Sequence, residues 1–66
     1  MEITVNGEPQ AFADVLTVAN LLDARGLAGK RLAVERNGEI VPKSRHADTL
    51  LVNGDQIEIV VAVGGG

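Results

Sequence analysis

Three Asn-Gly pairs, at positions 6–7, 37–38 and 53–54, restrict the fold of this 66-residue chain more than any other feature of its sequence. Asn-Gly is the residue pair that best supplies the positive φ angles of a tight hairpin turn. Around these pairs apolar and polar residues alternate, which is the pattern of a strand with one buried face. The chain is therefore predicted to consist mainly of short strands joined by tight turns.

Five segments carry this alternation or border a predicted turn. The predicted strands cover residues 2–6, 10–13, 31–35, 39–41 and 56–63. The last strand is the longest, and one of its faces is formed by Ile57, Ile59, Val61 and Val63. Phe12 is expected to face inward from the second strand. Pro42 is expected to end the fourth, because proline has no backbone N–H to donate to a sheet.

One helix is predicted between the two hairpins, over residues 18–25. Thr17 is suited to cap its first turn, because a threonine hydroxyl accepts a hydrogen bond from a backbone N–H that has no partner within the helix. Gly26 is suited to end the helix in a left-handed conformation. The buried stripe follows helical spacing and consists of Val18, Leu21 and Leu22. The polar residues 43–48 are expected to form a turn or a single helical turn.

The order of these elements is hairpin, helix, hairpin, connecting segment and last strand. It predicts an α+β protein with a β-grasp (ubiquitin-like) fold, in which one main helix packs on one face of a mixed sheet of four to five strands. An antiparallel sheet of another topology is the alternative, because periodicity does not distinguish the two. The β-grasp domain is expected to cover residues 1–63, followed by a flexible glycine tail at residues 64–66.

Composition argues against several classes of function. Six Lys and Arg face nine Asp and Glu, and Phe12 is the only aromatic residue, so nucleic-acid binding is disfavoured. The chain has no cysteine, which excludes thiolate chemistry and cysteine-based metal sites. His46, the lone histidine, is interpreted as a solvated turn residue, and no metal site is expected. No signal peptide or membrane-spanning run is apparent, so a cytoplasmic location is expected. No catalytic cluster is evident, which favours a carrier or binding module over an enzyme.

The feature that suggests a chemical role is the end of the sequence, where a predicted strand runs directly into Gly64, Gly65 and Gly66. Because glycine lacks a Cβ, such a segment can enter a channel too narrow for other residues. A terminal carboxyl has a reference pKa of about 3.3–3.7, so it is ionised at neutral pH and can attack the α-phosphate of ATP. A sulfur nucleophile can open the resulting acyl-adenylate to a thiocarboxylate. The alternative is a solvated tail without a function.

Residues 32–44, residues 52–59, the terminal glycines and the length of the chain together resemble the thiamine-biosynthesis sulfur carriers of the ThiS family. The resemblance implies that a ThiF-type enzyme adenylates Gly66, with Gly65 as the neighbour required for threading. ATP is then used by that partner, and no cofactor is bound to the carrier. A cysteine desulfurase or rhodanese-type protein is implied as sulfur donor, and a ThiG-type thiazole synthase as sulfur acceptor.

The surface beside the terminal glycines is expected to contact these partners. Its predicted residues are Val60, Ala62, Val63 and Gly64, with Ala33 on the neighbouring strand. A small apolar patch in this position can dock a partner protein, although scattered apolar residues on a sheet face are also common. Three other functions stay open: a molybdopterin-synthase sulfur carrier, a protein modifier ligated through Gly66, and an interaction domain with incidental glycines. Prolines just before the terminal glycines are typical of the molybdopterin carriers, and this chain has none there.

Overall fold

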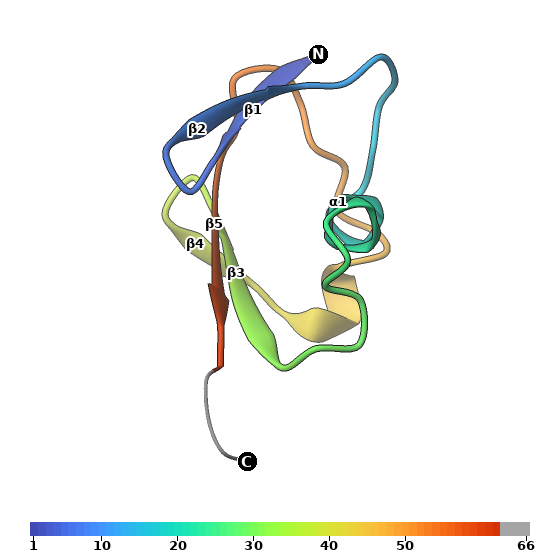
Figure 1. Ribbon diagram of the computed structural model, residues 1–66, viewed down its shortest axis with the longest axis vertical. Helices are drawn as coiled ribbons and strands as arrows, with labels where there is room; N and C mark the ends of the chain where they lie inside the picture. Colours follow the sequence, from blue (N-terminus) through green and yellow to red (C-terminus); the bar gives the residue numbers. More distant parts are fainter. Residues whose placement is uncertain (63–66) are drawn as a thin grey trace.

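The computed structural model describes residues 1–62, in which one α-helix packs against a five-stranded sheet (Figure 1). In chain order the elements are β1 (Glu2–Val5), β2 (Glu8–Ala11), α1 (Val18–Ala24), β3 (Leu32–Arg36), β4 (Glu39–Val41), the 3-10 helix η1 (Lys43–Arg45) and β5 (Gln56–Val61). The predicted order of elements is confirmed. β2 begins two residues earlier than predicted, because Asn6 and Gly7 alone complete the preceding turn.

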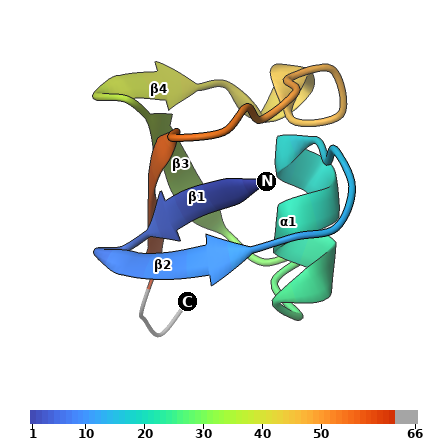
Figure 2. The same cartoon turned by 90° about the horizontal axis from the view of Figure 1, so that it is seen from above.

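The sheet has the strand order β2-β1-β5-β3-β4. β5 lies at its centre, parallel to β1 and antiparallel to β3. In Figure 2, α1 lies on one side of the sheet and the other side is left open. The parallel contact between the first and last strands makes the sheet mixed, as a β-grasp fold requires, and excludes the wholly antiparallel alternative.

Two of the Asn-Gly pairs form the hairpin turns that the sequence predicts. Asn6 and Gly7 have φ angles of 50° and 83°, and Asn37 and Gly38 have φ angles of 52° and 87°. Positive φ at both central residues is the type I′ geometry, whose twist matches that of the flanking strands. These turns fix the register of each hairpin and, with it, which side chains face α1.

Local signals fix both ends of α1. The Thr17 Oγ1 accepts a hydrogen bond from the Asn20 N–H at 3.1 Å, and the Asn20 side chain accepts one from the Thr17 N–H at 3.1 Å. At the other end, the Leu27 N–H donates to the Leu22 carbonyl at 2.8 Å and Gly26 has a φ of 72°. This pattern is a Schellman motif, which turns the chain back so that Leu27 packs against the core.

The core lies between α1 and the facing side of the sheet. Its buried members are Ile3, Val5, Val18, Leu21, Leu22, Val34, Val41, Leu51, Ile57 and Ile59. Phe12 packs against this cluster as predicted. Val61 was predicted on the buried face but is 37% exposed. It pairs with Leu32, which is itself only partly buried, so this pair marks the margin of the core.

The interpretation of His46 as a solvated turn residue is wrong. The side chain is half-buried, and its Nε2–H donates to the Val41 carbonyl at 3.0 Å. The His46 carbonyl accepts from the Ala19 N–H at 2.9 Å, so the residue joins the segment after η1 to the first turn of α1. The sequence did not reveal this role of His46, because both of its hydrogen-bond partners are backbone groups and the neighbouring residues are polar.

Candidate functional site

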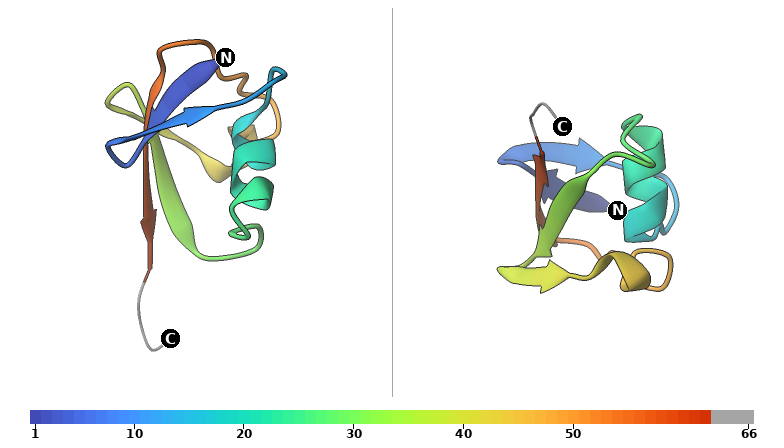
Figure 3. Two further views of the ribbon diagram at one scale, coloured as in Figure 1. Left: turned by 45° about the horizontal axis from the view of Figure 1, so that its top comes forward. Right: turned by 90° about the horizontal axis from the view of Figure 1, so that it is seen from below.

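The candidate site is the end of β5, the last strand before the terminal glycines in the sequence. β3 holds this end: Val61 lies opposite Leu32, and the Ala62 N–H donates to the Arg31 carbonyl at 2.9 Å. Figure 3 shows the end of β5 beside the start of β3, at the edge of the molecule. The sheet therefore fixes the direction of the chain up to Ala62.

The predicted partner surface is exposed where the structure describes it. Val60 is 61% exposed, and Ala33 lies directly opposite it on β3 and is also exposed. Ala62 is exposed one pleat further along β5. Ile40, which the sequence interpretation overlooked, is 62% exposed on β4 and faces the same side, because it lies opposite Glu35. Its outward orientation could have been inferred from the alternation with Val41, which is buried.

Four predicted site residues lie outside the described residues. They are the partner-contact residues Val63 and Gly64, and the reactive pair Gly65 and Gly66. Their roles remain predictions. Residues 1–62 define the surface from which these four residues continue.

Asn6 positions the second half of β5, because its side chain forms the hydrogen bonds that the backbone of a neighbouring strand would form. Its Oδ1 accepts from the Ile59 N–H at 2.7 Å, and its Nδ2 donates to the Ile59 carbonyl at 3.2 Å. Its own backbone N–H donates to the Ile57 carbonyl at 2.9 Å. The side chain thus extends the pairing along β5 by two residues after β1 has ended, and it sets the direction in which β5 runs.

Asp55 fixes the beginning of the same strand. Its buried carboxylate accepts hydrogen bonds from the Arg36 Nε at 2.8 Å, the Val52 N–H at 2.9 Å and the Asn37 Nδ2 at 3.0 Å. Burial by itself would raise the pKa of Asp55, but these hydrogen bonds and the charge of Arg36 hold that pKa below its ordinary value. Asp55 lies at the opposite end of β5 from the candidate site, so this carboxylate has a structural role.

No group of three His, Cys, Asp or Glu within residues 1–62 is placed to hold a metal ion. In the same part of the chain, no helix has the length and apolarity needed to cross a membrane. The open face beside Val60 carries two carboxylates directly opposite each other, Glu35 on β3 and Glu58 on β5. What this end of the molecule offers is an exposed apolar face beside the last described residues of the chain.

Comparison with known proteins gives matches over nearly the whole chain. The sequence model of the ThiS family matches residues 3–66, which include the terminal glycines. The chain is 46% identical over 66 residues to a thiazole synthase of Paramagnetospirillum magneticum, although it spans only 20% of that protein's length. It is 45% identical over 53 residues to the sulfur carrier protein ThiS of Bacillus subtilis, covering 80% of each chain.

A solved structure matches over the whole length. The crystal structure of the thiamine biosynthesis protein ThiS from Geobacter metallireducens superposes with a TM-score of 0.84 and 36% identity, covering all of both chains. This match confirms the β-grasp fold predicted from the sequence. With the sequence model matching nearly the whole chain and the fold shared in full, the chain belongs to the ThiS family.

Proposed function

We propose that this chain is a sulfur carrier in thiamine biosynthesis, and that its reactive group is the backbone carboxylate of Gly66. The observation that carries the proposal is the family match, which extends through the three terminal glycines. The structure supports it in a second way, because the described chain places an exposed apolar face next to the segment that leads to those glycines. The carrier is acted on by partner enzymes and does not itself catalyse the reaction.

The chemistry requires two displacement steps. In the first, a Gly66 carboxylate oxygen attacks the α-phosphorus of ATP on a ThiF-type partner, an acyl-adenylate forms and pyrophosphate leaves. In the second, hydrosulfide attacks the carbonyl carbon, the C–S bond forms, the C–O bond to AMP breaks and one proton is released. Where the donor carries this sulfur as a persulfide, a thiol reductant supplies the two electrons that release it as hydrosulfide. The thiocarboxylate then gives its sulfur to a ThiG-type thiazole synthase. The absence of cysteine supports this order of reaction steps, because the carrier has no thiol to capture its own activated carbonyl.

Intact-protein mass spectrometry tests the proposal directly. After incubation with ATP, the activating enzyme and a sulfide source, the chain is expected to gain the mass difference between one sulfur and one oxygen. A chain whose Gly66 carboxylate is capped as an amide is expected to keep its thermal unfolding midpoint and to show no gain. An unchanged mass of the intact chain with an activating enzyme that is active on another carrier would refute the proposal. Isopeptide-linked conjugates on a denaturing gel would instead indicate a protein modifier.

The role of the apolar face requires a separate test. Val60→Asp is expected to weaken binding to the activating enzyme by roughly tenfold or more, because it places a charge in the centre of the docking face. Val15→Asp is the matched control, since Val15 is 66% exposed and belongs to neither β5 nor β3. Equal affinity of the two variants would show that Val60 does not contact the enzyme.

A further inference from the structure

A second surface near the same end of the molecule is a groove on the helix side of the sheet. One wall is the loop after α1, and the other is formed by Lys43, the first residue of η1, and by His46, which follows η1. A cavity of about 140 Å³ lies between them, with Leu22, Leu27 and Leu32 as its apolar floor. An adjoining hollow of about 270 Å³ extends along α1 toward Ala19. The two hollows share Leu22, Gly29, Lys43 and His46, and they therefore form one continuous groove, here named the basic groove.

Hydrogen bonds to the backbone hold both walls in place. On the loop side, the Leu27 N–H bonds to the Leu22 carbonyl at 2.8 Å, and the Lys30 N–H bonds to the Leu27 carbonyl at 3.1 Å. On the other side, His46 is held by its bond to the Val41 carbonyl and by the Ala19 N–H. The basic groove is therefore largely preformed, which lowers the entropy cost of binding in it.

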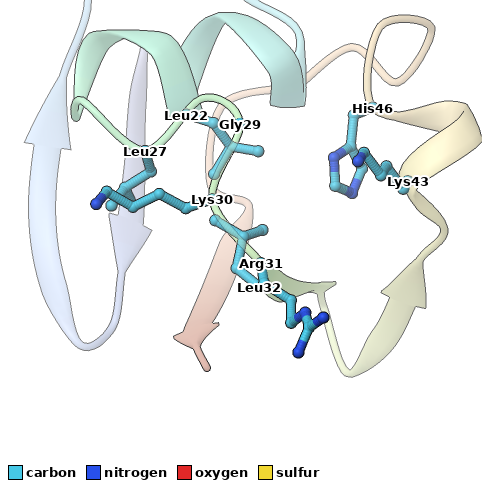
Figure 4. Close-up of a pocket in the computed structure, with 8 residues that line it drawn as sticks. All are labelled: Leu22, Leu27, Gly29, Lys30, Arg31, Leu32, Lys43 and His46. Carbon is cyan, nitrogen blue, oxygen red and sulfur yellow. The ribbon is translucent and has the colours of Figure 1, made fainter. Parts of the chain in front are cut away.

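The charge of the basic groove is opposite to that of the whole protein. Lys30, Arg31 and Lys43 lie on its rim, and no Asp or Glu lines either hollow. The net charge of the chain is -3. Within residues 1–62, Arg36 and Asp55 form the only ion pair shorter than 4 Å, so none of the three rim cations has a carboxylate partner there. In Figure 4 the charged ends of Lys30 and Arg31 point in different directions from the rim, whereas Lys43 lies beside His46. This spread suits several carboxylates along a segment better than one small anion.

The basic groove is coupled to the candidate site through Arg31. The side chain of Arg31 lines the groove, and its carbonyl accepts the hydrogen bond from the Ala62 N–H at 2.9 Å. The rim of the groove and the end of the described chain are therefore joined by one backbone hydrogen bond. The open face with Val60 and the groove lie on opposite sides of this point.

We propose that the basic groove binds an acidic segment of the thiazole synthase, with one apolar side chain inserted over Leu22, Leu27 and Leu32 and carboxylates paired with Lys30 and Lys43. A cavity of about 150 Å³ can hold a benzene ring, so the space suits one aromatic or leucine-sized side chain. The thiazole synthase is the chosen partner because two thiazole synthases contain a segment 46% and 39% identical to this whole chain. This inference rests on the proposed function only for the choice of partner.

The test compares two double variants with the same change in net charge. Lys30→Gln/Lys43→Gln neutralises the rim, and Arg25→Gln/Arg45→Gln removes two exposed cations that line neither hollow. The dissociation constants for purified thiazole synthase and for the adenylating enzyme are measured by calorimetry at low and high NaCl. The rim variant is expected to bind roughly fivefold to thirtyfold more weakly at low salt, and its affinity should depend less on salt. The control variant is expected to stay within about twofold of the unmodified chain.

Each outcome decides one question. If the rim variant binds as tightly as the unmodified chain, or if both variants lose the same affinity, the groove does not bind an acidic segment of the synthase. If the rim variant instead loses affinity only for the adenylating enzyme, the assigned partner is wrong. If the unmodified chain binds neither enzyme, the proposed function itself fails. Thermal unfolding of both variants checks the fold, and no change is expected because all four residues are exposed.

Discussion

Replacing Asp55 by asparagine tests whether the buried carboxylate at the start of β5 stabilises the fold. Asparagine keeps the shape of the side chain, and its one oxygen can still accept from the Arg36 Nε and the Val52 N–H, which both bond to Oδ2. The new amide NH2 would then face the Asn37 Nδ2, so two donors would meet. Asn37 cannot rotate to relieve this, because its Oδ1 accepts from the Gln56 N–H at 2.9 Å.

The expected cost follows from these contacts. A buried donor without a partner costs about 1–3 kcal/mol. Loss of the charge opposite Arg36 adds up to about 1 kcal/mol, since Arg36 is partly exposed. Asp55→Asn is therefore expected to lower the free energy of unfolding by about 3 kcal/mol. For a domain of this size, that loss corresponds to a fall in Tm of roughly 12–24 °C.

Thermal and urea unfolding at neutral pH measure this loss, and a reciprocal swap isolates its cause. In Asp55→Asn/Asn37→Asp, the carboxylate at position 37 accepts from Gln56 and from the new amide, so every donor has a partner again. The swap is expected to recover about 1 kcal/mol or more relative to Asp55→Asn alone. An Asp55→Asn variant as stable as the unmodified protein, or a swap no better than the single variant, would refute the assignment of the hydrogen bonds.

The difference in stability between the unmodified protein and Asp55→Asn is expected to depend on pH. Because the pKa of Asp55 in the folded state is below its ordinary value of 3.8, its stabilisation is fully present above that value and is lost as the pH falls through the folded-state pKa. The difference in Tm between the unmodified protein and Asp55→Asn should therefore be constant from neutral pH down to about pH 5 and narrow below about pH 4. A gap that widens in acid would contradict the direction of the pKa change.

Three further substitutions probe the elements that lead to the site. Thr17→Ala removes the cap of α1 and is expected to cost about 1 kcal/mol in urea unfolding. Asn6→Gly keeps the positive φ but removes both bonds to Ile59, so hydrogen exchange of the Ile59 amide should become faster, with a cost of about 1–2 kcal/mol; unchanged protection would argue against the strand-like role of Asn6. Glu58→Lys converts the facing pair with Glu35 into opposite charges and should raise stability by about 0.2–1 kcal/mol, an effect that high salt should reduce.

The sequence predicts best where the deciding contacts are local. The Asn37-Gly38 turn, the three residues of β4 and the cap at Thr17 depend on neighbours within about four positions, and their residue types show this directly. Asp55 depends on Arg36 and Asn37, which lie 19 and 18 residues away, so it is indistinguishable in sequence from any other turn aspartate. The basic groove depends likewise on packing between two loops.

The difference between local and distant contacts also explains why the exposure of Val60 was predicted from the sequence and that of Val61 was not. The outward orientation of Val60 follows from strand alternation. Its pairing with Ala33 depends on the register between β3 and β5, which are far apart in sequence, whereas the Asn37-Gly38 turn sets only the register between β3 and β4. The exposure of Val61 does not follow from alternation, because it depends on where the core ends. Leu32, its partner across the strands, gives no sign of this in the sequence.

The distribution of these features along β5 implies that stability and function can be changed separately. Asp55 stabilises the start of the strand, Asn6 supports its middle, and the proposed docking face begins at Val60. The basic groove includes none of these three residues. In many enzymes activity requires strained or destabilised groups, so stabilising mutations reduce activity. A carrier whose reactive group is a terminal backbone carboxylate has no such requirement in its core. The unfavourable contact on the docking face is the like-charged pair Glu35 and Glu58. Substitutions of this pair are therefore expected to weaken partner binding, whereas substitutions at Thr17 or Asp55 are expected to leave partner binding unchanged.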